Sequence, residues 1–132
     1  MQDYVETTLE SPAVEDDTPA PERARWLCCH VCRTCIVLAT ARMSFDGGHT
    51  HRFINPGGIA FQIALFDDAP GCSHEGEPTE YFSWFPGYTW RIAACSQCSA
   101  HLGWSFQCIG PPGAGEPAGF HGLILGRLRP QS

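Results

Sequence analysis

The 132-residue sequence contains no lysine, so all eight of its Lys and Arg residues are arginine. Seven acidic residues precede the first of them, Arg23, and from there on eight arginines face seven Asp and Glu residues. The net charge of −6 therefore belongs almost wholly to the N-terminus, and the rest of the chain is near neutral. Nucleic-acid binding needs a basic surface to meet the phosphates, so this balance argues against a nucleic-acid partner.

Long apolar runs are also missing. None approaches the ~18 residues that span a bilayer, and no basic start followed by an apolar segment marks a secretion signal. From these absences we expect no membrane partner and a cytoplasmic location. In a reducing compartment, eight cysteines are more typical of metal binding or reactivity than of disulfides.

No apolar stripe with the 3.6-residue period of a helix is found, and 14 Gly and 11 Pro leave little room for one. Short strand-like runs alternate instead with turns rich in Gly, Pro, Asn and Asp. The pattern predicts an all-β fold with long loops and a thin core, which a cross-link would stabilise. The expected strands cover residues 25–28, 36–40, 59–66, 81–85, 89–94, 101–108 and 121–128.

The length of the chain favours one domain with tails. Residues 1–22 combine acids with Pro, Ser and Thr and hold few large apolar groups, which predicts a disordered acidic tail. We expect the folded domain to span residues 23–129 and residues 130–132 to form a short second tail.

Two Cys-x-x-Cys pairs, Cys29/Cys32 and Cys95/Cys98, are separated by 62 residues. Such a turn presents two thiolates to one cation, and two turns complete a tetrahedral site suited to Zn²⁺. Four protein ligands leave no open coordination position, so we expect one structural zinc ion per chain rather than a catalytic metal. Cys32 and Cys35 have the same spacing, so the register stays ambiguous, although we prefer Cys29 with Cys32. Disulfides or inert thiols are the alternative.

Aromatic residues gather around the Pro86-Gly87 turn, where Trp84 and Trp90 flank it, and Trp104 follows the second cysteine pair. Because a metal would fix that pair, the strands that carry Trp90 and Trp104 should be neighbours, and three indoles would then meet. Core packing is the alternative interpretation, but the loop position of Trp84 and Trp90 favours a binding site. A small neutral ring fits against indole faces, and backbone donors and acceptors can bind its polar edge.

The segments LCCHVC, NPGG, TEYFSWFPGYTW, CSQC and HLGW resemble, in order and spacing, the thalidomide-binding (CULT) domain of the cereblon family over residues 24–128. The chain is most similar to single-domain bacterial members. The resemblance implies a β-tent-like fold of two antiparallel sheets pinned by structural zinc, with a cage for a glutarimide- or uracil-like ring. The implied zinc ligands are Cys29, Cys32, Cys95 and Cys98, and the implied ligand-binding residues are Asn55, Pro56, Phe61, Phe82, Ser83, Trp84, Trp90, Trp104 and Phe106.

The resemblance also implies how such a ring is held. In relatives, the carbonyl at the position of Phe82 accepts the imide N–H, and the amide at the position of Trp84 donates to an imide oxygen. Eukaryotic members have His where Phe82 stands, and this chain has one residue more between Glu80 and Ser83. A backbone contact tolerates a changed side chain, so we expect imide binding to survive. The chain lacks the partner domains of eukaryotic members, so we expect no ubiquitin-ligase partners from it.

A thiol enzyme is the second hypothesis, because zinc-pinned methionine sulfoxide reductases of the B type resemble this architecture. Its candidate nucleophiles are Cys72, near His74 in a predicted loop, and Cys108. Neither lies in a motif that matches the reductases, so we expect no catalysis. We predict instead that Cys28, Cys72 and Cys108 are small buried apolar residues.

The third hypothesis is an aromatic cage for methylammonium cations. Such a cage is normally rimmed by carboxylates, and residues 81–108 contain none. The remaining polar candidates carry no assigned role, since loop histidines and spread acids are usually solvated. The histidines in question are His49, His51, His74 and His121.

Overall fold

The computed structural model describes residues 25–131, and the predicted tail of residues 1–22 lies outside them. Within residues 25–131 the chain forms strands, the short 3₁₀ helices η1 (Ala39–Ala41) and η2 (Leu125–Arg127), and no α-helix. This confirms the all-β prediction. No helix in that range is long and apolar enough to cross a membrane.

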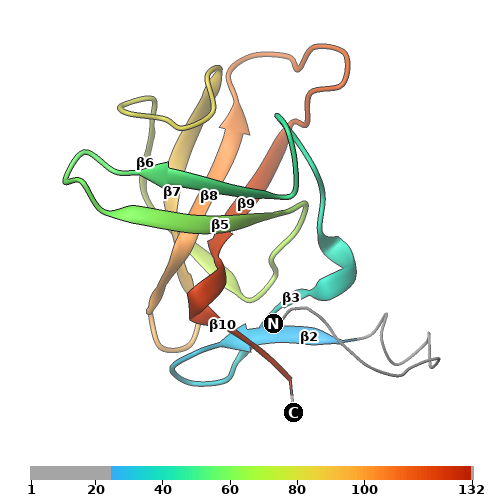
Figure 1. Cartoon of the computed structure of the whole chain (residues 1–132), viewed down its shortest axis with the longest axis vertical. Helices are drawn as coiled ribbons and strands as arrows, with labels where there is room; N and C mark the ends of the chain where they lie inside the picture. Colours follow the sequence, from blue (N-terminus) through green and yellow to red (C-terminus); the bar gives the residue numbers. More distant parts are fainter. Residues whose placement is uncertain (1–24, 132) are drawn as a thin grey trace.

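The strands form two antiparallel sheets, as predicted. Figure 1 shows β5 crossing β7, β8 and β9 at a steep angle, with the small sheet beyond one end of them. The small sheet has the order β10 (Leu128–Pro130), β2 (Trp26–Cys29), β3 (Cys35–Leu38). The large sheet has the order β4 (Thr50–Ile54), β5 (Ala60–Phe66), β9 (Gly119–Ile124), β8 (His101–Cys108), β7 (Tyr88–Cys95), β6 (Cys72–Thr79).

The strand predictions are wrong at three places. β6 lies where a loop was expected, because it is an edge strand of mostly exposed polar residues with no apolar alternation. β4 was missed because it buries part of His51 and exposes Ile54, the reverse of the usual pattern. Residues 81–85 were predicted as a strand for their aromatic content, yet they form a turn in which the N–H of Ser83 donates to the carbonyl of Glu80 at 3.1 Å.

The C-terminal boundary also differs. The run predicted as one strand, 121–128, is broken, because β9 ends at Ile124 and η2 turns the chain into the small sheet. β10 then extends to Pro130, which was placed in the tail, and the N–H of Gln131 donates to the carbonyl of Trp26 at 3.0 Å. One continuous segment thereby joins the two sheets.

Two apolar clusters lie on opposite faces of the large sheet, since successive strand residues point to opposite sides. On β5, Ala64 and Phe66 belong to the first cluster, which includes β3 of the small sheet, and Ile63 and Leu65 belong to the second. The second cluster is strongly aromatic. Its buried aromatic members are Phe85, Tyr88, Trp104, Phe106 and Phe120.

Gly103 on β8 packs against the backbone of β9 and leaves no room for a side chain. A Cβ atom there would lie 2.2 Å from the carbonyl oxygen of Gly122 and 2.9 Å from the Cα of Leu123. Because both atoms belong to the backbone, Gly103→Ala should lower the free energy of unfolding by about 2–3 kcal/mol, measured by urea denaturation. Gly126→Ala is the control, since a Cβ there meets nothing within 4 Å. Equal stability of the two variants would contradict this.

Candidate functional site

Two turns, at residues 29–34 and 95–100, hold the cysteine pairs in the same conformation. In each, the N–H two residues after the first cysteine donates to its sulfur at 3.4 Å. The N–H four residues after it donates to its carbonyl oxygen at 2.9 Å. That fourth residue, Arg33 or Ser99, has a left-handed backbone with φ of 66° or 67°. Two segments far apart in the sequence thus build the same metal-binding type of turn.

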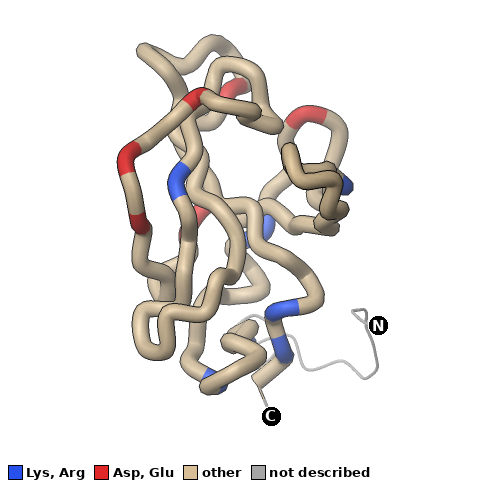
Figure 2. Tube along the Cα trace, turned by 90° about the vertical axis from the view of Figure 1, so that its left-hand side faces the viewer, with Lys and Arg blue, Asp and Glu red and all other residues tan. Residues whose placement is uncertain are grey.

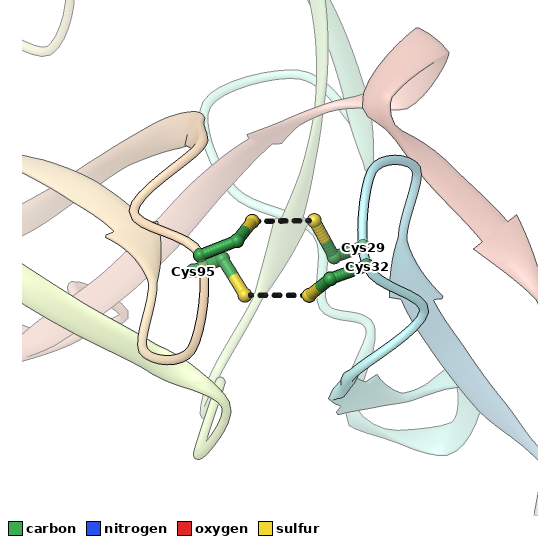
Figure 3. Close-up of side chains that lie close together, drawn as sticks. Cys29, Cys32 and Cys95 are labelled. Carbon is green, nitrogen blue, oxygen red and sulfur yellow. Dashed lines mark hydrogen bonds between the residues drawn. The ribbon is translucent and has the colours of Figure 1, made fainter.

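The two turns face each other and bring four sulfurs together (Figure 3). The Sγ atoms of Cys29 and Cys98 are 3.7 Å apart, those of Cys32 and Cys95 are 3.5 Å apart, and all four lie within 4.8 Å of one another. Metal–sulfur bonds of about 2.3 Å in a tetrahedron give S···S separations of about 3.8 Å, whereas a disulfide needs about 2.05 Å. The sulfur cluster therefore fits a metal ion with four thiolate ligands.

The structure resolves which cysteine belongs to the first pair. Cys35 lies on β3 opposite Cys28 in the strand pairing, and its sulfur accepts a hydrogen bond from the Gln131 side chain at 3.6 Å. Among residues 25–131, the sulfur cluster is the one group of three or more His, Cys, Asp or Glu side chains arranged to hold a metal. Cys29, and not Cys35, is thus the partner of Cys32.

Local hydrogen bonding favours the thiolate form of one of the four cysteines. Cys29 and Cys95 are buried, whereas Cys32 and Cys98 reach the surface. The Thr34 hydroxyl lies 3.0 Å from the Cys32 sulfur and lowers the pKa of that thiol to about 6. Metal ligands must be deprotonated, so Cys32 is ready to bind at neutral pH.

Removing one sulfur should release the metal. We expect one metal ion per chain in the native protein and less than a tenth of that in Cys98→Ser, measured by elemental analysis. Structural zinc sites contribute on the order of 10 kcal/mol to folding, so the variant should also lose its cooperative thermal transition. Cys35→Ser is the matched control and should keep both the metal ion and the cooperative thermal transition. A full metal content in Cys98→Ser would rule out the four-sulfur site.

A pocket of about 360 Å³ lies on the face of the second cluster, between the β4–β5 turn, the β6–β7 loop and strands β7 and β8. This volume is in the range of small-molecule sites. All the predicted ligand-binding residues except Ser83 line it. The lining residues are Asn55, Pro56, Phe61, Tyr81, Phe82, Trp84, Trp90, Ile92, His101, Trp104 and Phe106.

The three predicted indoles come together at this pocket. β7 pairs with β8, with Trp90 opposite Phe106 and Ile92 opposite Trp104, which confirms that the two Trp-bearing strands are neighbours. The rings of Trp84 and Trp104 lie 4.7 Å apart between centroids at 74°, an edge-to-face contact. Phe61 makes a similar contact with Trp104 at 5.2 Å. Flat aromatic surfaces on several sides therefore define the space.

Hydrogen bonds fix two of these indoles by their polar edges. The Nε1–H of Trp84 donates to the carbonyl of Ile54 at 3.2 Å, and that of Trp90 donates to the carbonyl of Tyr81 at 2.8 Å. The pairing of β6 with β7 is irregular between Glu75 and Thr79, just before the β6–β7 loop that contains Tyr81. Since the indole N–H groups are occupied, the rings offer the pocket mainly apolar surface.

The β6–β7 loop adds an unusual backbone conformation to the pocket wall. Phe82 has φ of 54°, which costs a residue with a side chain about 1–2 kcal/mol, and its side chain is 53% exposed. Within residues 25–131, no backbone or side-chain hydrogen bond uses the carbonyl of Phe82 or the N–H of Trp84. Ser83 lies outside the lining, and its hydroxyl donates to the carbonyl of Phe85 at 3.1 Å.

Sequence reasoning missed three lining residues: Tyr81, Ile92 and His101. Ile92 could have been found, because it lies two residues after Trp90 on the same face of a strand. His101 starts β8, where Arg127 donates to its carbonyl at 2.9 Å and burial lowers the pKa of its imidazole, which is therefore neutral at pH 7. No comparable pattern pointed to Tyr81.

The charges around the pocket favour an uncharged ligand. Its lining contains no Asp or Glu, and the guanidinium of Arg127 lies 5.9 Å from the centre of the Phe61 ring. Figure 2 shows the acidic positions on outer loops and strands in the upper part of the view, with several arginines nearer the C-terminus. Nothing in the lining would compensate a cation.

The fold and site define a small β domain in which four cysteines clasp two sheets beside an aromatic pocket. No protein-family model matches the sequence. The chain is 40% identical to protein cereblon of Drosophila persimilis over 91 residues, which cover 66% of this chain and 14% of the relative. It is 31% identical to protein cereblon of Danio rerio over 111 residues, 83% of this chain and 25% of the relative.

Protein cereblon of Drosophila melanogaster gives a third match, 36% identical over 89 residues, which cover 63% of this chain. These matches, together with the all-β fold, show that the chain contains a cereblon-like (CULT) domain. The chain spans only 14% to 25% of the length of these three relatives.

Proposed function

We propose that the pocket binds a small uncharged ring with an imide edge, such as glutarimide, a thalidomide analogue or the base of uridine. The observation that carries the proposal is the convergence of Trp84, Trp90 and Trp104 on one pocket without a charged lining residue. Indole faces favour the flat apolar part of such a ring, and exclusion of water strengthens its hydrogen bonds.

The polar edge of the ring has two backbone partners in this proposal. The carbonyl of Phe82 accepts the imide N–H, and the N–H of Trp84 donates to the adjacent imide oxygen. Both groups are unused by hydrogen bonds within residues 25–131, and they belong to the loop that Trp90 anchors through Tyr81. An imide presents a donor beside an acceptor, which matches this pair of groups.

We also propose that the metal is Zn²⁺. Four thiolates in a closed tetrahedral arrangement are the donor set typical of structural zinc, and no open position remains for catalysis. When bound, zinc would cross-link the two turns and offset part of the negative charge of the four thiolates. Elemental analysis of the purified protein distinguishes zinc from iron, which the same donor set also accepts.

Absence of catalysis is part of the proposal. Cys72 packs at the edge of the first cluster and Cys108 against the second, and neither lines the pocket. Burial raises the pKa of Cys72 to about 12, so its thiol is protonated at neutral pH and a poor nucleophile. Thiol-dependent reduction of a methionine sulfoxide peptide, lost in Cys72→Ala, would establish the enzyme hypothesis instead.

Ligand binding should depend on Trp84 and not on an indole outside the pocket. We expect Trp84→Ala to weaken glutarimide and uridine binding at least about 30-fold, as for a central aromatic contact worth about 2 kcal/mol. Trp26→Phe, on β2 of the small sheet, is the control and should bind normally. Isothermal titration measures both, since it needs no indole signal.

The same titration includes a trimethylammonium compound. The proposal expects no measurable binding of this cation, because no carboxylate lines the pocket. Retained imide affinity in a folded, metal-loaded Trp84→Ala protein would remove the cage assignment. Tight amine binding without an imide response would identify a methylammonium reader.

Reduced cysteines in the sulfur cluster suit the cytoplasm, which we propose as the compartment. Small neutral ligands are the partners that the pocket supports.

A further inference from the structure

Two histidines that were expected to be solvated loop residues lie on strands and touch. His74 belongs to β6 and His121 to β9, 47 residues apart in the sequence. A hydrogen bond joins their Nε2 atoms at 3.0 Å, with one ring as donor and the other as acceptor, and their rings are 5.1 Å apart between centroids at 29°. This histidine pair lies outside both the sulfur cluster and the aromatic pocket.

The strand pairing explains how the two rings meet. β7 and β8 separate β6 from β9 in the large sheet. His74 lies opposite Ala93, whose next neighbour is Gly103, and His121 lies opposite Ser105. These small residues leave the sheet surface open for two imidazoles to reach across it. His121 is two residues before Leu123 of the first cluster, so the pair occupies the face opposite the pocket.

We propose that His74 and His121 form a second metal site, which binds a divalent transition metal ion such as Ni²⁺ or Cu²⁺ through their two Nε2 atoms. Neutral imidazole nitrogens are the commonest side-chain ligands for these ions. The two Nε2 atoms come from separate strands and lie close enough to share one ion.

The separation of the nitrogens is compatible with one shared metal ion. Two nitrogens bound at about 2.0–2.1 Å lie about 2.9 Å apart when they are adjacent in a square-planar or octahedral site, and about 3.4 Å apart in a tetrahedral one. The hydrogen-bonded separation of 3.0 Å lies between these values, so a metal ion can replace the hydrogen bond with little movement of the rings.

Burial favours the neutral form of both imidazoles, which is the charge state that binds metal. Burial lowers the pKa of His121 to about 4, with His74 contributing, and burial also lowers the pKa of His74. One Nε2 donates in the hydrogen bond between the rings, so binding of both Nε2 atoms to a metal requires that proton to move to the Nδ1 of the same ring. The Nδ1 atom of His121 is buried and has no hydrogen-bond partner within residues 25–131.

The charged neighbours of the pair are few and of both signs. Asp67 and Asp68 directly follow Phe66, which is paired with His121, and their negative charge acts on that imidazole. Arg91 on β7 opposes a cation, but its guanidinium is engaged with the carbonyl oxygens of His74 and Gly76 at 3.2 and 3.0 Å. Among the described residues, the pair belongs to no group of three or more candidate ligands, so water would supply the remaining positions around a bound ion.

The test is an isothermal calorimetric titration of the full chain with Ni²⁺, after the sulfur cluster has been loaded with Zn²⁺. We expect one Ni²⁺ per chain without release of the first metal, and at least tenfold weaker binding in both His74→Gln and His121→Gln. His51→Gln is the matched control, because His51 is bonded to the carbonyls of Phe45 and Gly48 away from the pair. Absence of binding, or binding that His74→Gln leaves unchanged, would overturn the site.

A second measurement needs no substitution and so does not depend on the variants folding. In the NMR spectrum of the native protein, substoichiometric Ni²⁺ should broaden the imidazole signals of His74 and His121 before those of the other histidines. Selective broadening elsewhere would refute the assignment. The outcome is separate from the proposed imide function, since glutarimide titration reports on the opposite face of the sheet.

Discussion

The contact between four cysteine sulfurs is the constraint on which the rest of the structure depends. Sulfurs crowded within 4.8 Å of one another cannot all be ionised unless a cation balances them. One turn belongs to the small sheet and the other joins β7 to β8 of the large sheet. A metal bound by the cluster would therefore set the position of one sheet against the other, where the thin first cluster alone would hold them loosely.

The aromatic pocket is directly connected to the sulfur cluster by strands β7 and β8. Trp90 and Cys95 both lie on β7, and Trp104 lies on β8, which follows the second cysteine turn. The carbonyl of Arg127 accepts the N–H of His30, inside the first cysteine turn, at 3.1 Å, while its guanidinium donates to the carbonyl of His101 at the pocket. The position of the pocket wall thus depends on the sulfur cluster through two strands and one arginine. Disorder of the sulfur cluster would therefore also disorder the pocket.

The sequence predicted those features that spacing or residue type determines locally. Cysteine spacing predicted the sulfur cluster, although it left the pair Cys32/Cys35 as an alternative, and it correctly placed the strand of Trp90 beside the strand of Trp104. Sequence-based prediction failed where tertiary contacts determine the local structure. β6 is an edge strand whose polar residues show no periodic pattern. The aromatic segment 81–85 is a turn because it covers a pocket. The pairing of His74 with His121 spans four strands, so no local pattern could reveal it.

Recognition through the backbone would explain why the strained turn at Phe82 carries a large exposed side chain. A left-handed φ at this position turns the carbonyl of Phe82 and the N–H of Trp84 away from the hydrogen bonds of a strand. The conformational cost of about 1–2 kcal/mol is offset by contacts such as the Trp90–Tyr81 hydrogen bond at 2.8 Å. In the proposed function, the folded loop then needs no rearrangement to bind an imide, so the side chain at 82 can vary without loss of the two backbone contacts.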